Sequence, residues 1–157
     1  MTTTTDGRVT GLQRSAGGVP KLPVERAMVR VGGMEGDRQA NRKYHGGPDR
    51  ALCLYSQERL DALAAEGNPL ERGTLGENVT IAGLPWEEVR PGVRLRLGAV
   101  EVEVTSFAAP CSKIAGGFAN GLSTRVGEKV NPGWSRVYVR VLAEGEISVG
   151  NAVTILR

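Results

Sequence analysis

Residues 93–105 carry the pattern that most constrains the fold of this chain. Residues 93–97 alternate apolar side chains with arginine, and residues 100–105 alternate valine with glutamate and threonine. A period of two places one face of each segment in a core and leaves the other face exposed, which is typical of half-buried β-strands. Gly98 and Ala99 separate the two runs, so the pattern predicts an antiparallel hairpin with a two-residue turn.

Further strands are predicted wherever short apolar or alternating runs are bounded by turn residues. The 22 glycines and 8 prolines of the 157-residue chain favour short strands and tight turns over long helices. The chain is therefore predicted to be mainly β, with a barrel or a sandwich favoured over a βαβ fold. These additional strands are expected over residues 24–31, 51–55, 78–81, 137–141 and 152–156.

One segment predicts a helix. Ser56 can cap its start, and Glu58 lies favourably in its first turn. Leu60, Leu63 and Ala64 form an apolar stripe at helical spacing. The sequence Gly-Asn-Pro at 67–69 is expected to end the helix.

The length of the chain predicts a single domain over residues 1–157, with its core over about 9–157. Residues 1–5 are expected to be a disordered end. The first residues have no basic start followed by an apolar run, and no stretch approaches the length of a membrane helix. We therefore expect a cytoplasmic protein with two free thiols.

Several familiar catalytic classes lack their motifs here. The sequence contains no G-x-S-x-G, no Walker A loop and no G-x-G-x-x-G before a helix. Two cysteines and one histidine are too few for a closed zinc site built from these residue types alone. These observations exclude the usual hydrolase, nucleotide-binding and zinc-finger patterns.

Basic residues gather between positions 38 and 50. Arg38, Arg42, Lys43 and Arg50 face only two nearby aspartates in the sequence. Arginine binds phosphate through two parallel hydrogen bonds, so this cluster favours a small anionic ligand. Nucleic acid is the competing partner, but a net charge of +3 and 4% aromatic residues argue against a stacking surface.

Two motifs in the first half of the chain place polar residues next to glycines. His45 precedes two glycines, whose backbone N–H groups can surround an anion, and Arg50 follows at the start of a predicted strand. Glu77 and Asn78 follow Gly76 and precede a short strand. Each motif has a plainer interpretation, an exposed turn histidine for the first and local turn-closing hydrogen bonds for the second.

Cys111 lies directly after Pro110 and two residues before Lys113, at the end of a predicted strand. A nearby cation favours the thiolate, which is the nucleophilic and metal-binding form of cysteine. The alternative is a buried cysteine at a strand end. Cys53, inside the apolar run ALCLY, is predicted to be an ordinary core residue.

Taken in order, these motifs resemble those of the molybdenum cofactor sulfurase C-terminal (MOSC) domain family. The resemblance rests on their combination and covers the chain from about Val9 onward. The family often has a basic or polar side chain just before Pro-Cys, where this chain has Ala108 and Ala109. The matching segments are Gly36–Gln39, His45–Ala51, Leu75–Thr80, Pro110–Lys113, Gly133–Val137 and Gly145–Gly150.

The resemblance implies a closed or partly closed β-barrel, related to the small barrel of pyruvate kinase, with one or a few short helices. It also implies the molybdenum cofactor (molybdopterin), with Cys111 as both the catalytic residue and the metal ligand. The residues that this resemblance assigns to the cofactor's phosphate and pterin are Arg38, His45, Gly46, Arg50, Glu77, Asn78, Lys113 and Arg136.

Stand-alone members of the family are linked to the reduction of N-hydroxylated compounds. The resemblance thus implies a molybdenum-dependent oxidoreductase that acts on a small-molecule substrate and takes electrons from a separate protein. One alternative is a sulfur carrier that holds a persulfide on Cys111 after delivery by a cysteine desulfurase. Another is a non-catalytic barrel that binds anions or nucleic acid through its arginines. The sequence does not distinguish the oxidoreductase from the sulfur carrier, because both functions need an exposed thiolate.

Overall fold

The computed structural model describes residues 4–15, 20–37, 48–110, 118 and 123–156. Within these residues, seven strands close into a barrel, because β1 pairs with β6 on one side and with β11 on the other. The order around the barrel is β11-β7-β8-β9-β5-β6-β1, and only the β5–β6 pair is parallel. The barrel strands are β1 (Thr4–Arg14), β5 (Leu52–Ser56), β6 (Val79–Ala82), β7 (Arg94–Leu97), β8 (Val100–Phe107), β9 (Val137–Ala143) and β11 (Ala152–Leu156).

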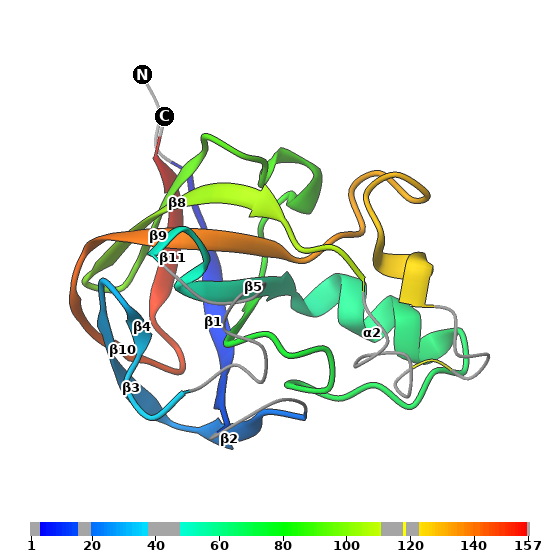
Figure 1. The fold of residues 1–157 in the computed structure, drawn as a ribbon, viewed down its shortest axis with the longest axis horizontal. Helices are drawn as coiled ribbons and strands as arrows, with labels where there is room; N and C mark the ends of the chain where they lie inside the picture. Colours follow the sequence, from blue (N-terminus) through cyan, green and yellow to red (C-terminus); the bar gives the residue numbers. More distant parts are fainter. Residues whose placement is uncertain (1–3, 16–19, 38–47, 111–117, 119–122, 157) are drawn as a thin grey trace.

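The remaining elements lie around this barrel (Figure 1). A short strand, β2 (Leu22–Val24), continues the sheet beside β1. A separate three-stranded sheet has the order β10-β3-β4. Its strands and the helical segments are β3 (Arg26–Arg30), β4 (Gly33–Met34), β10 (Gly145–Ser148), α2 (Gln57–Ala65) and the short 3-10 helices η1 (Pro48–Arg50), η2 (Trp86–Glu88) and η4 (Ser123–Val126).

The structure confirms the predicted hairpin at residues 93–105. In the β7–β8 pair Leu97 lies opposite Val100 and Leu95 opposite Val102, and all four side chains are buried. The arginines of β7 are exposed, as the period of two requires. Gly98 in the turn has φ +60°, a backbone conformation that favours glycine.

The predicted helix is also confirmed, with one correction to its apolar face. The Oγ of Ser56 accepts a hydrogen bond from the Arg59 N–H at 3.1 Å, so Ser56 is the N-cap. Leu60 and Leu63 are buried, but Ala64 is exposed. α2 follows directly from β5 and lies to one side of the barrel, so it buries a narrower stripe than predicted (Figure 1).

The N-terminal part of the chain differs most from expectation. Residues 1–5 were predicted as a disordered end, whereas Thr4 and Thr5 belong to β1, with Thr4 opposite Ile155. The single strand expected over residues 24–31 is interrupted at Glu25, which separates β2 from β3. β1 pairs with β2, β6 and β11, so partners from distant parts of the sequence define it.

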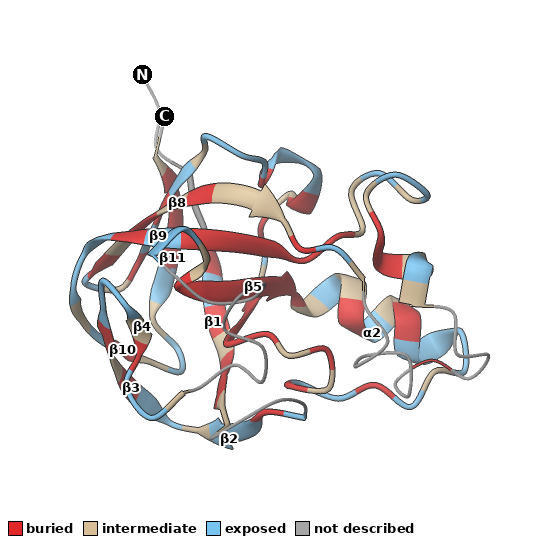
Figure 2. Ribbon diagram, in the orientation of Figure 1, coloured by how far each residue is buried: buried red, intermediate tan, exposed pale blue. Residues whose placement is uncertain are grey.

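The core runs along the barrel strands, and β1, β5 and β9 carry long buried stretches (Figure 2). The described part of the chain includes no helix that is long and apolar enough to cross a membrane. A group of polar side chains is buried with the core residues and does not follow from the apolar pattern: Gln13, Lys21, Ser56, Glu77, Asn78, Thr80, Ser135, Arg136 and Thr154.

Candidate functional site

The predicted site residues divide into those that the structure describes and those that it does not. Cys111, the predicted catalytic and metal-binding residue, lies outside the described residues, directly after Pro110. The same holds for Arg38, His45, Gly46 and Lys113. The structure describes Arg50, Glu77, Asn78 and Arg136. The last three are buried close to one another in the interior of the protein.

Asn78 joins two strands at the point where β6 begins. Its Oδ1 accepts a hydrogen bond from the Cys53 N–H at 3.0 Å, and its Nδ2 donates to the Gln13 carbonyl at 3.3 Å. Its own N–H donates to the Cys53 carbonyl at 2.7 Å. A buried amide with both ends bonded in this way ties the backbones of β1 and β5 to the start of β6, the strand between them. Its predicted contact with a cofactor stays a prediction.

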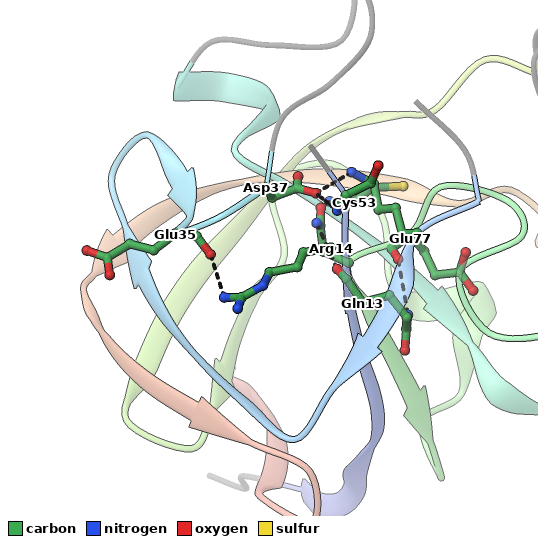
Figure 3. A network of polar contacts seen from close by, with 9 residues as sticks. Gln13, Arg14, Glu35, Asp37, Cys53 and Glu77 are labelled. Atoms are coloured by element: carbon green, nitrogen blue, oxygen red, sulfur yellow. Dashed lines mark hydrogen bonds and ion pairs between the residues drawn. The ribbon is translucent and has the colours of Figure 1, made fainter. Parts of the chain in front are cut away.

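Gln13 is a buried polar residue that the sequence did not point to. Its Nε2 donates to the Glu77 carbonyl and to the Thr80 Oγ1, each at 3.1 Å. Figure 3 shows Gln13 reaching from β1 toward Glu77. A glutamine within a strand carries no sequence signal of burial, because most glutamines are exposed. Only the pairing of β1 with β6 brings this side chain inside.

Glu77 is a fully buried carboxylic acid. Its Oε2 accepts a hydrogen bond from the Gly73 N–H at 3.1 Å, whereas Oε1 has no hydrogen-bond partner within the described part of the chain. Burial raises the pKa of Glu77 to about 7, against the lowering effects of the Gly73 N–H and the Arg136 cation. The turn-closing interpretation thus accounts for the hydrogen bond of one carboxyl oxygen.

Arg136 is a buried cation that contacts two separate segments. Its Nη1 donates to the Leu75 carbonyl at 2.9 Å, and its Nη2 donates to the Ala109 carbonyl at 3.1 Å. The Arg136 carbonyl in turn accepts from the Ala108 N–H at 2.9 Å. Its Nε is buried without a hydrogen-bond partner among the described residues. Arg136 therefore fixes the chain two residues before Cys111.

Cys53 is the buried core thiol that the sequence predicted. It is free, 3% exposed, and packs with Ala108 and Tyr138. Burial raises the pKa of Cys53 to about 11, although Arg136 acts in the opposite direction. Cys53 is therefore protonated at neutral pH and is not a nucleophile in the folded protein.

Arg50 reaches the same region from a different segment. It ends η1, with Ala51 between it and β5, and its guanidinium carbon lies 5.4 Å from the centroid of the Tyr138 ring. Tyr138 packs with Cys53 and Ala108. Arg50 is therefore near the segment that leads to Cys111, which agrees with its predicted place at a strand entrance.

A buried ion pair holds the segment that precedes Arg38. The Lys21 Nζ lies 2.6 Å from the Asp37 Oδ1, and the two side chains are 4% and 5% exposed. The same oxygen accepts a hydrogen bond from the Ser15 N–H at 3.0 Å (Figure 3). The sequence placed Asp37 beside the basic cluster and in the family segment Gly36–Gln39, without indicating a buried ion pair. The role of Lys21 had no sequence signal.

The segment before β9 is anchored by aromatic and arginine side chains. The Tyr55 hydroxyl donates to the Trp134 carbonyl, and the Trp86 Nε1–H donates to the Ser135 carbonyl, each at 2.8 Å. The guanidinium carbons of Arg59 and Arg125 lie 4.6 and 4.1 Å from the Trp134 ring centroid. Such cation–π contacts fix the ring and thereby the residues next to Arg136.

The described side chains suggest an anion site more readily than a metal site. No group of three histidine, cysteine, aspartate or glutamate residues within the described ranges could hold a metal ion. Arg136 and Arg50 supply positive charge, and Glu77 supplies a carboxyl group that is partly protonated near neutral pH.

The fold is a small closed β-barrel. Several buried polar side chains, among them Glu77, Asn78 and Arg136, lie next to the ends of its strands and close to the predicted motifs. The family profile of the MOSC domain matches residues 41–154, and the chain belongs to the MOSC domain family. The match includes the His-Gly-Gly, Gly-Glu-Asn and Pro-Cys motifs.

Two bacterial relatives support this assignment. The chain is 37% identical over 141 residues to the uncharacterized protein YflK of Bacillus subtilis, covering 88% of this chain and 63% of that protein. It is 38% identical over 86 residues to the protein YiiM of Escherichia coli, covering 52% of this chain and 38% of that protein. The chain thus spans less than two thirds of the length of either relative.

Solved structures show the same fold. The crystal structure of YiiM from Escherichia coli has a TM-score of 0.66 and 27% identity, covering 96% of this chain and 70% of that one. The YuaD protein from Bacillus subtilis has a TM-score of 0.73 and 17% identity, covering 98% and 97% of the two chains. At 17% identity, the second likeness concerns the fold alone.

Proposed function

We propose that the protein binds the molybdenum cofactor, with Cys111 as the metal ligand, and reduces N-hydroxylated small molecules. The MOSC family is generally associated with this cofactor. The observation that carries the proposal is the buried Arg136, which holds the Ala109 carbonyl two residues before Cys111. A buried cation next to this segment favours an anionic ligand and a thiolate there.

The described residues fit a group that is anionic and rich in hydrogen-bonding atoms. The Arg136 Nε is a buried donor and the Glu77 Oε1 a buried acceptor, and neither has a partner within the described ranges. Buried polar atoms normally find a partner, so these two support a polar ligand close to them. A pterin offers both donors and acceptors, and its phosphate offers negative charge.

The proposed contacts follow the predicted assignment. Arg38, His45, Arg50 and Lys113 would bind the phosphate, and the backbone N–H of Gly46 would add a donor. Glu77, Asn78 and Arg136 would form the base of the site. The Asn78 amide and both Nη atoms of Arg136 already bond within the protein, so these groups would mainly hold the surrounding loops.

The bound cofactor would supply two-electron redox chemistry. The residues of this chain would bind and orient it, keep the Cys111 thiolate ionised and admit the small-molecule substrate. Electrons would come from a separate electron-transfer protein.

Elemental analysis tests this proposal. The protein and its Cys111→Ser variant would be made in the same cofactor-competent host, and molybdenum and released pterin would be measured per folded chain. We expect molybdenum in the wild-type protein and a loss of at least about tenfold in the variant. Equal molybdenum in both proteins, or none in either, would refute the proposal.

The sulfur-carrier alternative predicts a different result from the same preparations. Incubation with a cysteine desulfurase and cysteine would add the mass of about one sulfur atom to Cys111 in metal-free protein. Such a mass increase, without molybdenum in the wild-type protein, would replace the cofactor proposal with persulfide carriage. Salt-sensitive RNA binding that survives Cys111→Ser would instead support the non-catalytic barrel.

A further inference from the structure

Arg136 is predicted to contact a cofactor, yet both terminal nitrogens of its guanidinium group already donate hydrogen bonds within the protein. One Nη donates to the Leu75 carbonyl and the other to the Ala109 carbonyl. Leu75 lies two residues before Glu77, and Ala109 lies two residues before Cys111. A single planar group thus joins the turn before Glu77 to the end of the segment that leads to Cys111.

The surroundings of Arg136 hold this group firmly in place. Its backbone carbonyl accepts from the Ala108 N–H at 2.9 Å and from the Ser135 hydroxyl at 2.7 Å. The Tyr55 hydroxyl bonds the Trp134 carbonyl on the same segment and makes no hydrogen bond to the guanidinium group. The side chain and the backbone of Arg136 therefore bond to consecutive residues, Ala108 and Ala109.

The geometry also explains why arginine is needed there. Two carbonyl oxygens on different segments need two donors in one plane, and the guanidinium group provides them at a fixed spacing. Lysine carries the same charge but is a compact ammonium on a flexible chain, so it can replace one bond more easily than both. The Ala108–Ala109 pair has no polar side chains of its own to hold this segment.

We propose that Arg136 is a positioning residue, which sets the place of residues 105–109, the approach to Cys111, relative to the Glu77–Asn78 turn through its bridge between Leu75 and Ala109. The bridge itself is a property of the described structure. Its consequence for molybdenum binding rests on the proposed function of Cys111.

Amide hydrogen exchange on the metal-free protein tests the bridge. Arg136→Met removes the charge and both donors, Arg136→Lys keeps the charge, and Tyr55→Phe is the matched control on the same segment. We expect exchange to accelerate together in residues 74–78 and 105–109, by about a hundredfold in Arg136→Met and about tenfold in Arg136→Lys. The exchange rates of the β7 and β11 amides should rise only as far as the loss of global stability, measured by urea unfolding, requires.

The control removes the Tyr55 hydroxyl bond to Trp134 and leaves the guanidinium group in place. It should accelerate amide exchange near Trp134 without accelerating exchange jointly in residues 74–78 and 105–109. Acceleration in only one of these two segments, or an equal change in all amides, would overturn the bridge.

Molybdenum content separates the positioning role from the cofactor proposal. Per folded chain, we expect Tyr55→Phe to load like the wild type, Arg136→Lys to load less, and Arg136→Met to load at least about tenfold less. Equal loading of all variants would overturn the positioning role while the cofactor proposal stands. A wild-type protein without molybdenum would refute the cofactor proposal, and the exchange experiment would still decide on the bridge.

Discussion

The β7–β8 hairpin and the β1–β6 pair lie on different sides of the barrel and have different interiors. All buried side chains of β7 and β8 are apolar, and their partners across the hairpin follow strict alternation. The β1–β6 pair buries Gln13 and Thr80, which bond to each other, and its register shifts between Val9 and Gly11. The regular side follows from local sequence, whereas the irregular side borders Glu77 and Asn78 of the predicted site.

This difference has a physical reason. Apolar side chains need no specific partner, so alternation alone buries them. Buried polar groups must each find a hydrogen-bond partner, and their partners here come from distant segments. The β1–β6 side should therefore tolerate substitution less well than the β7–β8 side.

The largest expected effect comes from a glycine on the polar side. Gly73 has φ +90°, and a Cβ there would lie within van der Waals overlap of the Lys21 carbonyl oxygen. An alanine at Gly73 would be strained by the left-handed backbone conformation and by overlap with the Lys21 carbonyl. We therefore expect Gly73→Ala to lower the free energy of unfolding by about 4 to 5 kcal/mol. Urea unfolding monitored by tryptophan fluorescence would measure this change.

Gly150 is the matched control, before β11. It has φ +96°, but a Cβ there would meet nothing within 4 Å. Gly150→Ala should therefore cost only the backbone strain, about 1 to 2 kcal/mol. Equal costs at the two glycines would show that close contact around Gly73 does not matter.

The next effect compares a buried with an exposed ion pair. Asp37 pairs with Lys21 at 2.6 Å in the interior, whereas Glu103 of β8 pairs with Arg140 at 3.2 Å at the surface. Asp37→Ala leaves a buried ammonium without its carboxylate and should cost about 4 kcal/mol. Glu103→Ala should cost less than about 1 kcal/mol.

Both ion-pair variants would be unfolded in urea at low and at high salt. The exposed pair should weaken with salt, while the buried pair should change little. A cost below 1 kcal/mol for Asp37→Ala would mean that water reaches Lys21 in solution.

The third effect is a pH dependence that comes from Glu77. Its pKa is about 7 in the folded protein, against an ordinary value of 4.5. Between these values the folded state binds more protons than the unfolded state, so this group lowers the free energy of unfolding as pH rises. The change should total roughly 3 kcal/mol and level off above pH 7.

Glu77→Gln keeps the acceptor for the Gly73 N–H but cannot ionise. From pH 4.5 to 7 the unfolding free energy of the wild type should therefore fall relative to that of the variant. Urea titrations at half-unit pH steps would measure it. A constant difference across this range would show that Glu77 ionises as readily as an exposed carboxyl.

Local sequence was enough for a large part of the fold. The hairpin at 93–105 and the Ser56 cap were predicted from neighbouring residues, because turn chemistry and side-chain periodicity act over a few positions. The burial of Cys53 followed in the same way from the apolar run around it. The family motifs identified the chain as a MOSC domain before any geometry was considered.

The tertiary structure decided what local sequence does not encode. β1 was missed because its glycines and polar residues show no alternation, and it exists as a strand through its pairing with β2, β6 and β11. Lys21 and Gln13 gave no signal, since contacts with distant segments bury them, Asp37 for Lys21 and β6 for Gln13.

The amino-acid sequence by itself determined the family, the regular strands and the residue types at the predicted site. Only the tertiary structure decided that Arg136 bonds to Leu75 and Ala109, at sequence separations of 61 and 27 residues. A buried charge takes the partners that the fold brings within reach, and the sheet order β8-β9-β5-β6 brings these two segments near Arg136.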